Sequence, residues 1–134
     1  MIRCVRIWTG DDSNSHFEEG FIDLAGGARG DLMSGTLETG HASFQETRSG
    51  GTFEWHTAPT RQLVVTLSGT LDFKTRGGQH FILKPGDILL AEDTTGGGHR
   101  WSLVDEQPWR RLYVVLQPGA KVPFRRAASQ GGTP

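Results

Sequence analysis

The sequence predicts an all-β fold in a single domain. Nineteen glycines among 134 residues interrupt the chain at short intervals, and the runs between them are rich in β-branched and aromatic residues. Short runs of this kind, separated by turn residues, are typical of strands joined by tight turns. No window shows a convincing helical period of 3.6 residues over three turns. The spacing of the runs suits a sandwich or a barrel.

The expected strands follow one another along most of the chain. In order they are Arg3–Trp8, Glu19–Leu24, Thr36–Thr47, Gln62–Leu67, Thr70–Thr75, Gln79–Leu83, Ile88–Ala91, His99–Val104 and Trp109–Gln117. Ser68-Gly69 and Gly77-Gly78 read as hairpin turns, and Pro85-Gly86-Asp87 as a tight corner.

The two ends of the chain are expected to be looser than its middle. Residues 1–35 read as N-terminal strands and a Gly-rich loop, Ala25–Gly35, of a length that often covers a pocket. Residues 36–117 read as the barrel, and residues 118–134 as a frayed tail. Lys121, Arg125 and Arg126 in this tail would meet an acidic partner or, as the favoured interpretation, water.

Strand alternation predicts what each face of Gln62–Leu67 meets. One face carries Gln62 and Thr66 with a valine between them, whereas the other carries only aliphatic side chains and needs a cover. A second subunit in a homodimer is the simplest cover, and an N-terminal segment folded over the sheet is the alternative.

Composition narrows the possible partners and the location. The formal net charge is −1 and the pI is about 6.5, so neither a nucleic-acid surface nor a membrane-binding field is expected. No apolar run is long enough to span a membrane, and the first ten residues are too short and polar for a signal peptide. Cys4 is the only cysteine, which excludes an internal disulfide and makes a cytoplasmic location the expectation.

The segments HTAPTRQLVVTLSG and PGDILLAEDTTGGGH each combine a histidine, an apolar strand and turn glycines. They resemble the two motifs of the cupin superfamily, whose members are small double-stranded β-helix (jelly-roll) barrels. In HTAPTRQLVVTLSG, Gly69 takes the final glycine of the first motif, Gln62 falls on its glutamate, His56 on its first histidine and Ala58 on its second. In PGDILLAEDTTGGGH, the turn, the strand and His99 resemble the second motif. The combined stretch is also similar to single-domain bacterial cupins without an assigned function.

The resemblance implies a metal site at His56, Gln62 and His99, although one usual ligand is replaced by an amide and another is lost. Imidazole nitrogens and an amide oxygen suit a divalent ion such as Fe, Mn, Ni or Zn. Three neutral ligands would leave the full charge of the ion in place and favour an anionic substrate. Alternatively, His56 caps the adjacent corner, and Gln62 orients a histidine by hydrogen bonding.

Further residues are expected around this site. Alternation places Val64 and Thr66 on the inward face with Gln62, and Trp101 on the face of His99. His41 would supply a missing ligand from an adjacent strand. Glu92-Asp93 would serve as a general base if the loop folded inward, but a solvated turn is the favoured interpretation.

Two functions follow from these features. The first is a metal-dependent enzyme, of the dioxygenase, decarboxylase, isomerase or lyase type, acting on a small anionic organic molecule. The alternative is a binding or sensor barrel without metal or catalysis. Regulation of DNA is disfavoured, because the chain has no spare length or basic helix for a helix-turn-helix module.

Overall fold

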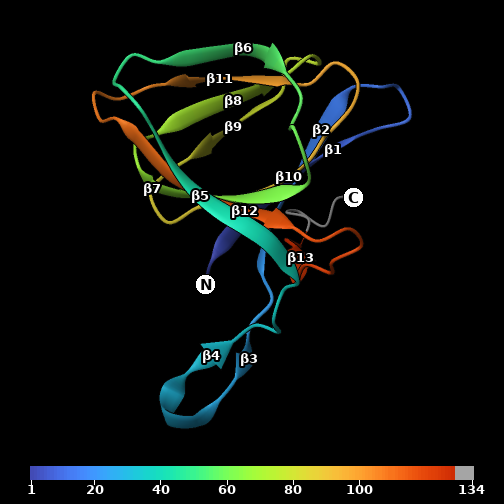
Figure 1. The fold of residues 1–134 in the computed structure, drawn as a ribbon, viewed down its shortest axis with the longest axis vertical. Helices are drawn as coiled ribbons and strands as arrows, with labels where there is room; N and C mark the ends of the chain where they lie inside the picture. The colour runs from blue at the N-terminus through green and yellow to red at the C-terminus, as the bar shows by residue number, and fades with distance from the viewer. Residues whose placement is uncertain (129–134) are drawn as a thin grey trace.

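The computed structural model, which describes residues 1–128, consists of two facing β-sheets and a small protruding hairpin (Figure 1). The larger sheet has the order β13-β2-β1-β10-β7-β12-β5, and the smaller has the order β6-β11-β8-β9. Strand β1 runs parallel to β10, and the other pairs are antiparallel. The bounds are β1 (Arg3–Thr9), β2 (Ser15–Ile22), β3 (Ala25–Gly26), β4 (Leu32–Met33), β5 (Thr39–Thr47), β6 (Thr52–His56), β7 (Gln62–Ser68), β8 (Leu71–Thr75), β9 (His80–Leu83), β10 (Ile88–Glu92), β11 (His99–Leu103), β12 (Trp109–Leu116) and β13 (Phe124–Arg126).

The all-β class predicted from the glycine spacing is confirmed. Each expected strand overlaps an observed one, whereas β3, β4, β6 and β13 are strands that the sequence analysis does not predict. Within residues 1–128, no helix has the length and apolar character needed to cross a membrane.

The interior between the sheets is filled at one end and hollow at the other. The filled end is aromatic and aliphatic: Phe81 stacks against Phe73 with ring centroids 5.2 Å apart and meets Phe17 at 4.6 Å. Val5 and Ile7 of β1 are fully buried beside them. This packing holds the two sheets together where β1, β2 and β9 lie. The cavity described below lies between the sheets at the other end, where β5 and β12 face β6.

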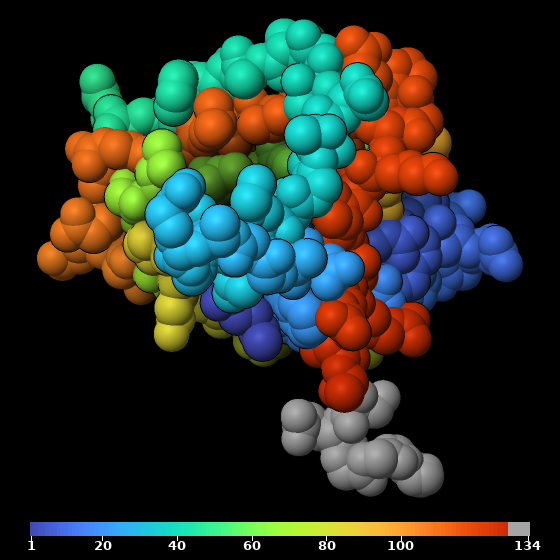
Figure 2. Space-filling model, turned by 90° about the horizontal axis from the view of Figure 1, so that it is seen from below, coloured from blue at the N-terminus to red at the C-terminus, as the bar shows by residue number. Residues whose placement is uncertain are grey.

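The outer face of the larger sheet is covered by the chain itself. Leu63, on the aliphatic face of β7, is buried in a second cluster with Leu90 and Leu116, and Ala120 and Phe124 of the C-terminal segment pack on this cluster. Seen from below in Figure 2, the hairpin segment in light blue and the C-terminal segment in red lie on this side of the molecule. Part of the cover that the sequence analysis assigns to a second subunit is thus supplied within the chain, and the homodimer stays a prediction.

The C-terminal segment packs on the larger sheet and ends in strand β13 (Phe124–Arg126) rather than forming a frayed tail. Strand β13 pairs with β2, and Arg126 contacts Glu18 at 2.7 Å, while Arg125 contacts Asp23 at 3.3 Å. Gly20 of β2 permits this docking, because a Cβ there would lie 2.5 Å from the Phe124 ring. The expectation of a frayed tail is therefore wrong up to Arg126, although the side chains of Arg125 and Arg126 stay in water as expected, at 65% and 74% exposure. Residues 129–134 lie outside the described part of the chain.

The Gly-rich segment Ala25–Gly35 also differs from expectation. It forms the hairpin β3–β4, which extends away from the barrel in Figure 1 and leaves Leu32 and Met33 exposed. None of its residues lines the cavity between the sheets, so it does not cover a pocket here.

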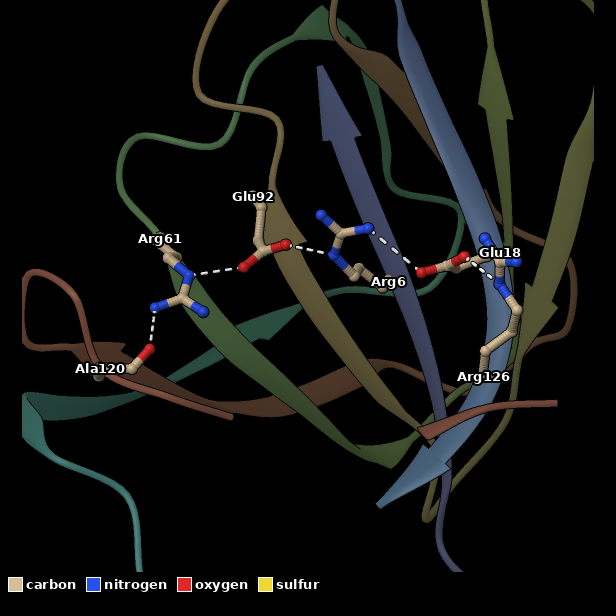
Figure 3. Close-up of polar contacts among 6 residues, drawn as sticks. All are labelled: Arg6, Glu18, Arg61, Glu92, Ala120 and Arg126. Atoms are coloured by element: carbon tan, nitrogen blue, oxygen red, sulfur yellow. Dashed lines mark hydrogen bonds and ion pairs between the residues drawn. The ribbon is translucent and has the colours of Figure 1, made fainter. Parts of the chain in front are cut away.

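A row of alternating charges crosses the outer face of the larger sheet (Figure 3). Glu92 at the end of β10 accepts hydrogen bonds from Arg6 at 2.5 Å and from Arg61 at 2.6 Å. Arg6 also donates to Glu18, and Arg61 donates to the backbone carbonyl of Ala120. Through these contacts Glu92 links three strands (β10, β1 and β2), the corner before β7 and the C-terminal segment. This corrects the expectation that Glu92 belongs to a solvated turn.

Replacing Glu92 should destabilise the fold more than replacing an exposed ion-pair partner. We expect Glu92→Ala to lower the free energy of unfolding by about 1–2 kcal/mol, because two partly buried arginines lose a charged acceptor. The matched control is Glu46→Ala, since the side chain of Glu46 is 53% exposed in its pair with Arg110; this change should cost less than about 0.5 kcal/mol. Urea unfolding of both variants measures the difference, and equal effects would contradict the role given to Glu92.

Candidate functional site

The two sheets enclose a cavity of about 620 Å³ at the end away from the aromatic packing. Its walls come from β5, β7, β10 and β12 of the larger sheet and from β6, β8 and β11 of the smaller one. β5 and β6 are edge strands of their respective sheets, so the barrel is not closed by hydrogen bonds between them. In Figure 2, β5 forms the upper rim of the molecule. The exposed polar side chains of β5 border this side of the cavity, whereas aromatic and aliphatic side chains form its floor.

His99 opens strand β11 and is held from behind by a buried carboxylate. Its Nδ1 lies 2.5 Å from Oδ2 of Asp93, which is fully buried and also accepts a hydrogen bond from Ser15 Oγ at 2.6 Å. A ring nitrogen facing a carboxylate carries the proton, so Nε2 is left as the acceptor or ligand atom on the cavity side. The expectation of a solvated turn is wrong for Asp93 as well.

His56 ends strand β6 and faces His99 across the ladder. The two rings lie with centroids 4.6 Å apart and nearly edge to face, and Phe53 stacks on the other side of His56 at 3.7 Å. Its Nδ1 meets the backbone carbonyl of Glu54 at 2.7 Å, which again leaves Nε2 free. Burial lowers the pKa of His56 and the neighbouring His99 lowers it further, while the Glu54 carbonyl partly offsets both. Both imidazoles therefore commit Nδ1 to the protein and keep Nε2 without a described partner, and both line the cavity.

Gly98 allows this close approach of the two histidine strands. Its φ is +72°, and a Cβ at this position would lie 2.2 Å from the carbonyl oxygen of His56. Any other residue would push β11 away from β6. The glycine run before His99 is thus a packing requirement of the site, not only a flexible link.

Gln62 reaches the same end of the cavity from the larger sheet. It is buried to 6% exposure and sits between Ala91 of β10 and Val115 of β12 in the sheet register. The described residues give its side-chain amide no hydrogen-bond partner, and the amide lines the cavity. A buried amide requires a partner, so Gln62 is available to a ligand.

The remaining predicted residues divide into lining and supporting positions. Val64, Trp101 and His41 line the cavity, His41 from the exposed strand β5. Thr66 faces the same way but lies outside the lining, where it accepts a hydrogen bond from Trp109 Nε1 at 3.3 Å. Ala58, at the position of the lost histidine, is buried and lines the cavity.

The metal ligands expected from the resemblance share one cavity, but the set is poor in charge. Within residues 1–128, no group of three or more histidine, cysteine, aspartate or glutamate side chains is placed to hold an ion. The lining includes no aspartate or glutamate, and Asp93 lies behind His99. The orientation of His56 and His99 fits an ion, whereas the absence of a lining carboxylate makes any site a weak one.

Cys4 has no role in this chemistry. It is fully buried on the outer side of β1, away from the cavity, and burial raises the pKa of its thiol to about 12. Such a thiol stays protonated and unreactive at neutral pH.

Arg111 is the residue of this site that the sequence analysis missed. Strand β12 alternates Trp109, Arg111, Tyr113 and Val115 toward the cavity, and all four line it. Arg111 is only 2% exposed, and its guanidinium lies 3.7 Å from the centre of the Trp109 ring. An arginine alternating with aromatic residues in one strand was the signal that could have identified it.

Comparisons with known proteins agree with this architecture. A family model described as "AraC-like ligand binding domain" matches residues 41–129. The comparison with curated proteins gave no match.

Solved structures with similar folds include three bacterial proteins. A DUF861 family protein from Thermotoga maritima is 19% identical with a TM-score of 0.46, over 55% of this chain and 77% of that one. An uncharacterized conserved protein with a double-stranded β-helix domain from Klebsiella pneumoniae is 22% identical with a TM-score of 0.46, over 66% and 74%. A cupin 2 conserved barrel domain protein from Leptotrichia buccalis is 16% identical with a TM-score of 0.45, over 69% and 44%.

The free energy of unfolding should depend on pH through the titration of His56. The folded chain lowers the pKa of His56 below its ordinary value of about 6.5, so between the two values the unfolded chain binds more protons. The free energy of unfolding should therefore be fully retained above pH 6.5 and fall as the pH drops below it. In His56→Gln this component should disappear.

Two measurements check this expectation. Proton NMR titration of the His56 ring, in the presence of a chelator, gives its pKa directly, and urea unfolding between about pH 5 and 8 gives the stability slope. Replacing His99 by Gln should raise the pKa of His56, because a charged His56 would no longer lie beside a second ring that can itself carry positive charge. A pKa of His56 above 6.5 in the folded protein would be inconsistent with the geometry.

Proposed function

The chain belongs to the family of AraC-like ligand binding domains, and from this premise we propose that its barrel is a receptor for one small organic molecule. The observation that carries the proposal is the cavity of about 620 Å³ with unpartnered polar groups on its wall. Gln62 and the Nε2 atoms of His56 and His99 have no described hydrogen-bond partner in the protein. Cavities of this size, largely apolar with a few convergent polar groups, are typical small-molecule sites.

The shape of the site supports a bound molecule of modest size. Phe73 and Trp101 give flat apolar surfaces, and the polar groups gather at the end where β6, β7 and β11 meet. A ligand would therefore bury its body on the aromatic floor and direct a hydrogen-bonding group toward Gln62 and the histidines. The open side between β5 and β6 offers a route of entry.

Ligand binding should depend on the free volume beside the histidines. Ala58→Phe adds a ring to the cavity wall, so we expect it to weaken binding about tenfold or more. Ala42→Phe is the matched control, because Ala42 lies on β5 but outside the cavity lining and is exposed. Saturation-transfer NMR with a set of small aromatic and aliphatic acids, amides and alcohols provides the readout, with thermal melting to verify folding. Equal binding by both variants would place the ligand outside the cavity.

A metal-dependent enzyme is the second candidate, favoured by one specific observation. His56 and His99 each commit Nδ1 to an oxygen of the protein and keep Nε2 free, which is the usual arrangement of metal-binding histidines. With Gln62 they would hold a divalent ion, which when bound would act as a Lewis acid toward an anionic substrate. Asp93 would keep His99 in the tautomer required. This second proposal covers dioxygenase, decarboxylase, isomerase and lyase chemistry. A cytoplasmic location stays a prediction for either candidate.

Metal content separates the two candidates. If the second holds, elemental mass spectrometry of protein equilibrated with Fe²⁺, Mn²⁺, Ni²⁺ or Zn²⁺ should find close to one ion per chain. His56→Ala and His99→Ala should each lose it, whereas His80→Ala, at an exposed histidine of β9, should keep it. A wild-type protein that takes up no ion would exclude the enzyme and leave the receptor.

A further inference from the structure

We propose that Arg111 anchors a carboxylate, so that the molecule held in the barrel is an organic monoacid with an apolar body. This inference rests on the proposed function, since it names the class of ligand for the same cavity. The negative charge expected of the ligand then follows from Arg111 and not from a metal ion.

Arg111 is buried without a counterion among the described residues. The residue is 2% exposed, yet none of the ion pairs between described residues includes it. Its neighbours Thr66 and Gln45 in the sheet register are neutral. By contrast, Arg110, the next residue on the outer face, pairs with Glu46. A guanidinium removed from water without a negative partner is costly, and a bound anion would remove this cost.

The hydrogen bonds of Arg111 show which part of the side chain remains available. Nε donates to Tyr113 Oη at 3.1 Å, and Nη1 donates to Thr47 Oγ1 at 2.7 Å and to the backbone carbonyl of Trp109 at 3.1 Å. A guanidinium has five N–H groups, so the two on Nη2 are left without a described partner. Nη2 is not sealed in protein, because the only fully enclosed side-chain atom without a partner among the described residues is Asp93 Oδ1. Nη2 therefore keeps some accessible surface, and because Arg111 lines the cavity, these donors are the ones that a ligand there can reach.

The aromatic surroundings orient the guanidinium but do not neutralise it. Its centre lies 3.7 Å from the Trp109 ring, 5.5 Å from Tyr113 and 5.8 Å from Trp101. A cation–π contact stabilises a guanidinium by less than the cost of removing its charge from water. The positive charge is thus held in a fixed plane and still lacks an opposite charge.

The charge of the cavity selects a monoanion. Arg111 is the only lysine or arginine in the lining, and the lining includes no aspartate or glutamate. One carboxylate of charge −1 balances this single cation, whereas a phosphate monoester carries about −1.5 to −2 at neutral pH. A carboxylate also matches the planar donors of a guanidinium.

The position of Arg111 defines the rest of the ligand. Val115 is the register partner of Gln62, and Arg111 lies four residues earlier on β12, about 13 Å away at about 3.3 Å per residue. Phe73, Val64 and Leu89 line the space between the two polar ends. The acid would lie at the Arg111 end, with its apolar body along these side chains and a hydrogen-bonding group directed at Gln62 and the histidines.

The test uses matched acids and amides with the full-length chain. Isothermal titration calorimetry would compare benzoate, 3-phenylpropionate, 4-phenylbutyrate and their 4-hydroxy derivatives with the corresponding primary amides. We expect at least one acid to bind at least about tenfold more tightly than its amide, and this preference to vanish in Arg111→Met. Arg111→Lys should keep part of it, and the exposed control Arg110→Met should keep all of it.

The outcomes separate this inference from the proposed function. Amides that bind as well as their acids would overturn the role of Arg111 and leave the receptor intact. Failure of every acid and amide to bind the wild-type protein would overturn both.

A second readout does not require a ligand. In the ligand-free protein, Arg111→Met should leave the melting temperature unchanged or raise it, because an unbalanced buried cation is removed. Sodium 3-phenylpropionate should raise the melting temperature of the wild-type protein but not that of Arg111→Met. A large fall in the melting temperature of ligand-free Arg111→Met would mean that Arg111 stabilises the fold itself, and would overturn the proposal.

Discussion

The architecture of the site depends on one buried carboxylate that joins the two sheets. Asp93 follows β10 of the larger sheet, accepts from Ser15 of β2 in the same sheet, and meets His99 of β11 in the smaller one. Its backbone carbonyl also accepts from the amide of Ala58, which brings the β6–β7 corner to the same point. Buried charges persist only with such partners, so this contact fixes both the separation of the sheets and the tautomer of His99.

The cavity combines two polar ends that arise from different physical causes. At one end, His56 and His99 each use Nδ1 for a contact with the protein, to the backbone and to Asp93 respectively, and keep Nε2 free. The side-chain amide of Gln62 has no described partner. At the other end, Arg111 carries a charge that aromatic rings hold but do not compensate. The family to which the chain belongs consists of AraC-like ligand binding domains. In this chain, these two polar ends are the groups with which a bound ligand would form polar contacts.

The fold could be predicted from the sequence because turn chemistry and strand composition act locally. Glycine spacing and strand composition predicted nine of the thirteen strands, with β2 displaced toward the C-terminus. His56, Gln62 and His99, chosen from the motif spacing, line one cavity. Strand β13 was missed because its pairing with β2 depends on a distant glycine, Gly20, which leaves room for the Phe124 ring. Asp93 was misjudged because an acidic pair after a strand is usually solvated, and only tertiary contacts show that it is buried. The role of Arg111 could not be predicted, because the sequence does not show which face of β12 is enclosed.

The edge position of β5 has a consequence for how the interior exchanges its contents. β7 is bonded to a neighbour on each side, whereas β5 is bonded only to β12 in the described part of the chain, and nearly all its side chains are exposed. Displacing β5 therefore breaks one ladder of hydrogen bonds and little apolar packing, while displacing β7 would break two ladders and the core. The wall that carries His41 and borders Arg111 is thus held to the barrel by a single ladder, as β6 is in the facing sheet. Local fraying of this strand would widen the open side between β5 and β6 while the rest of the barrel remains folded.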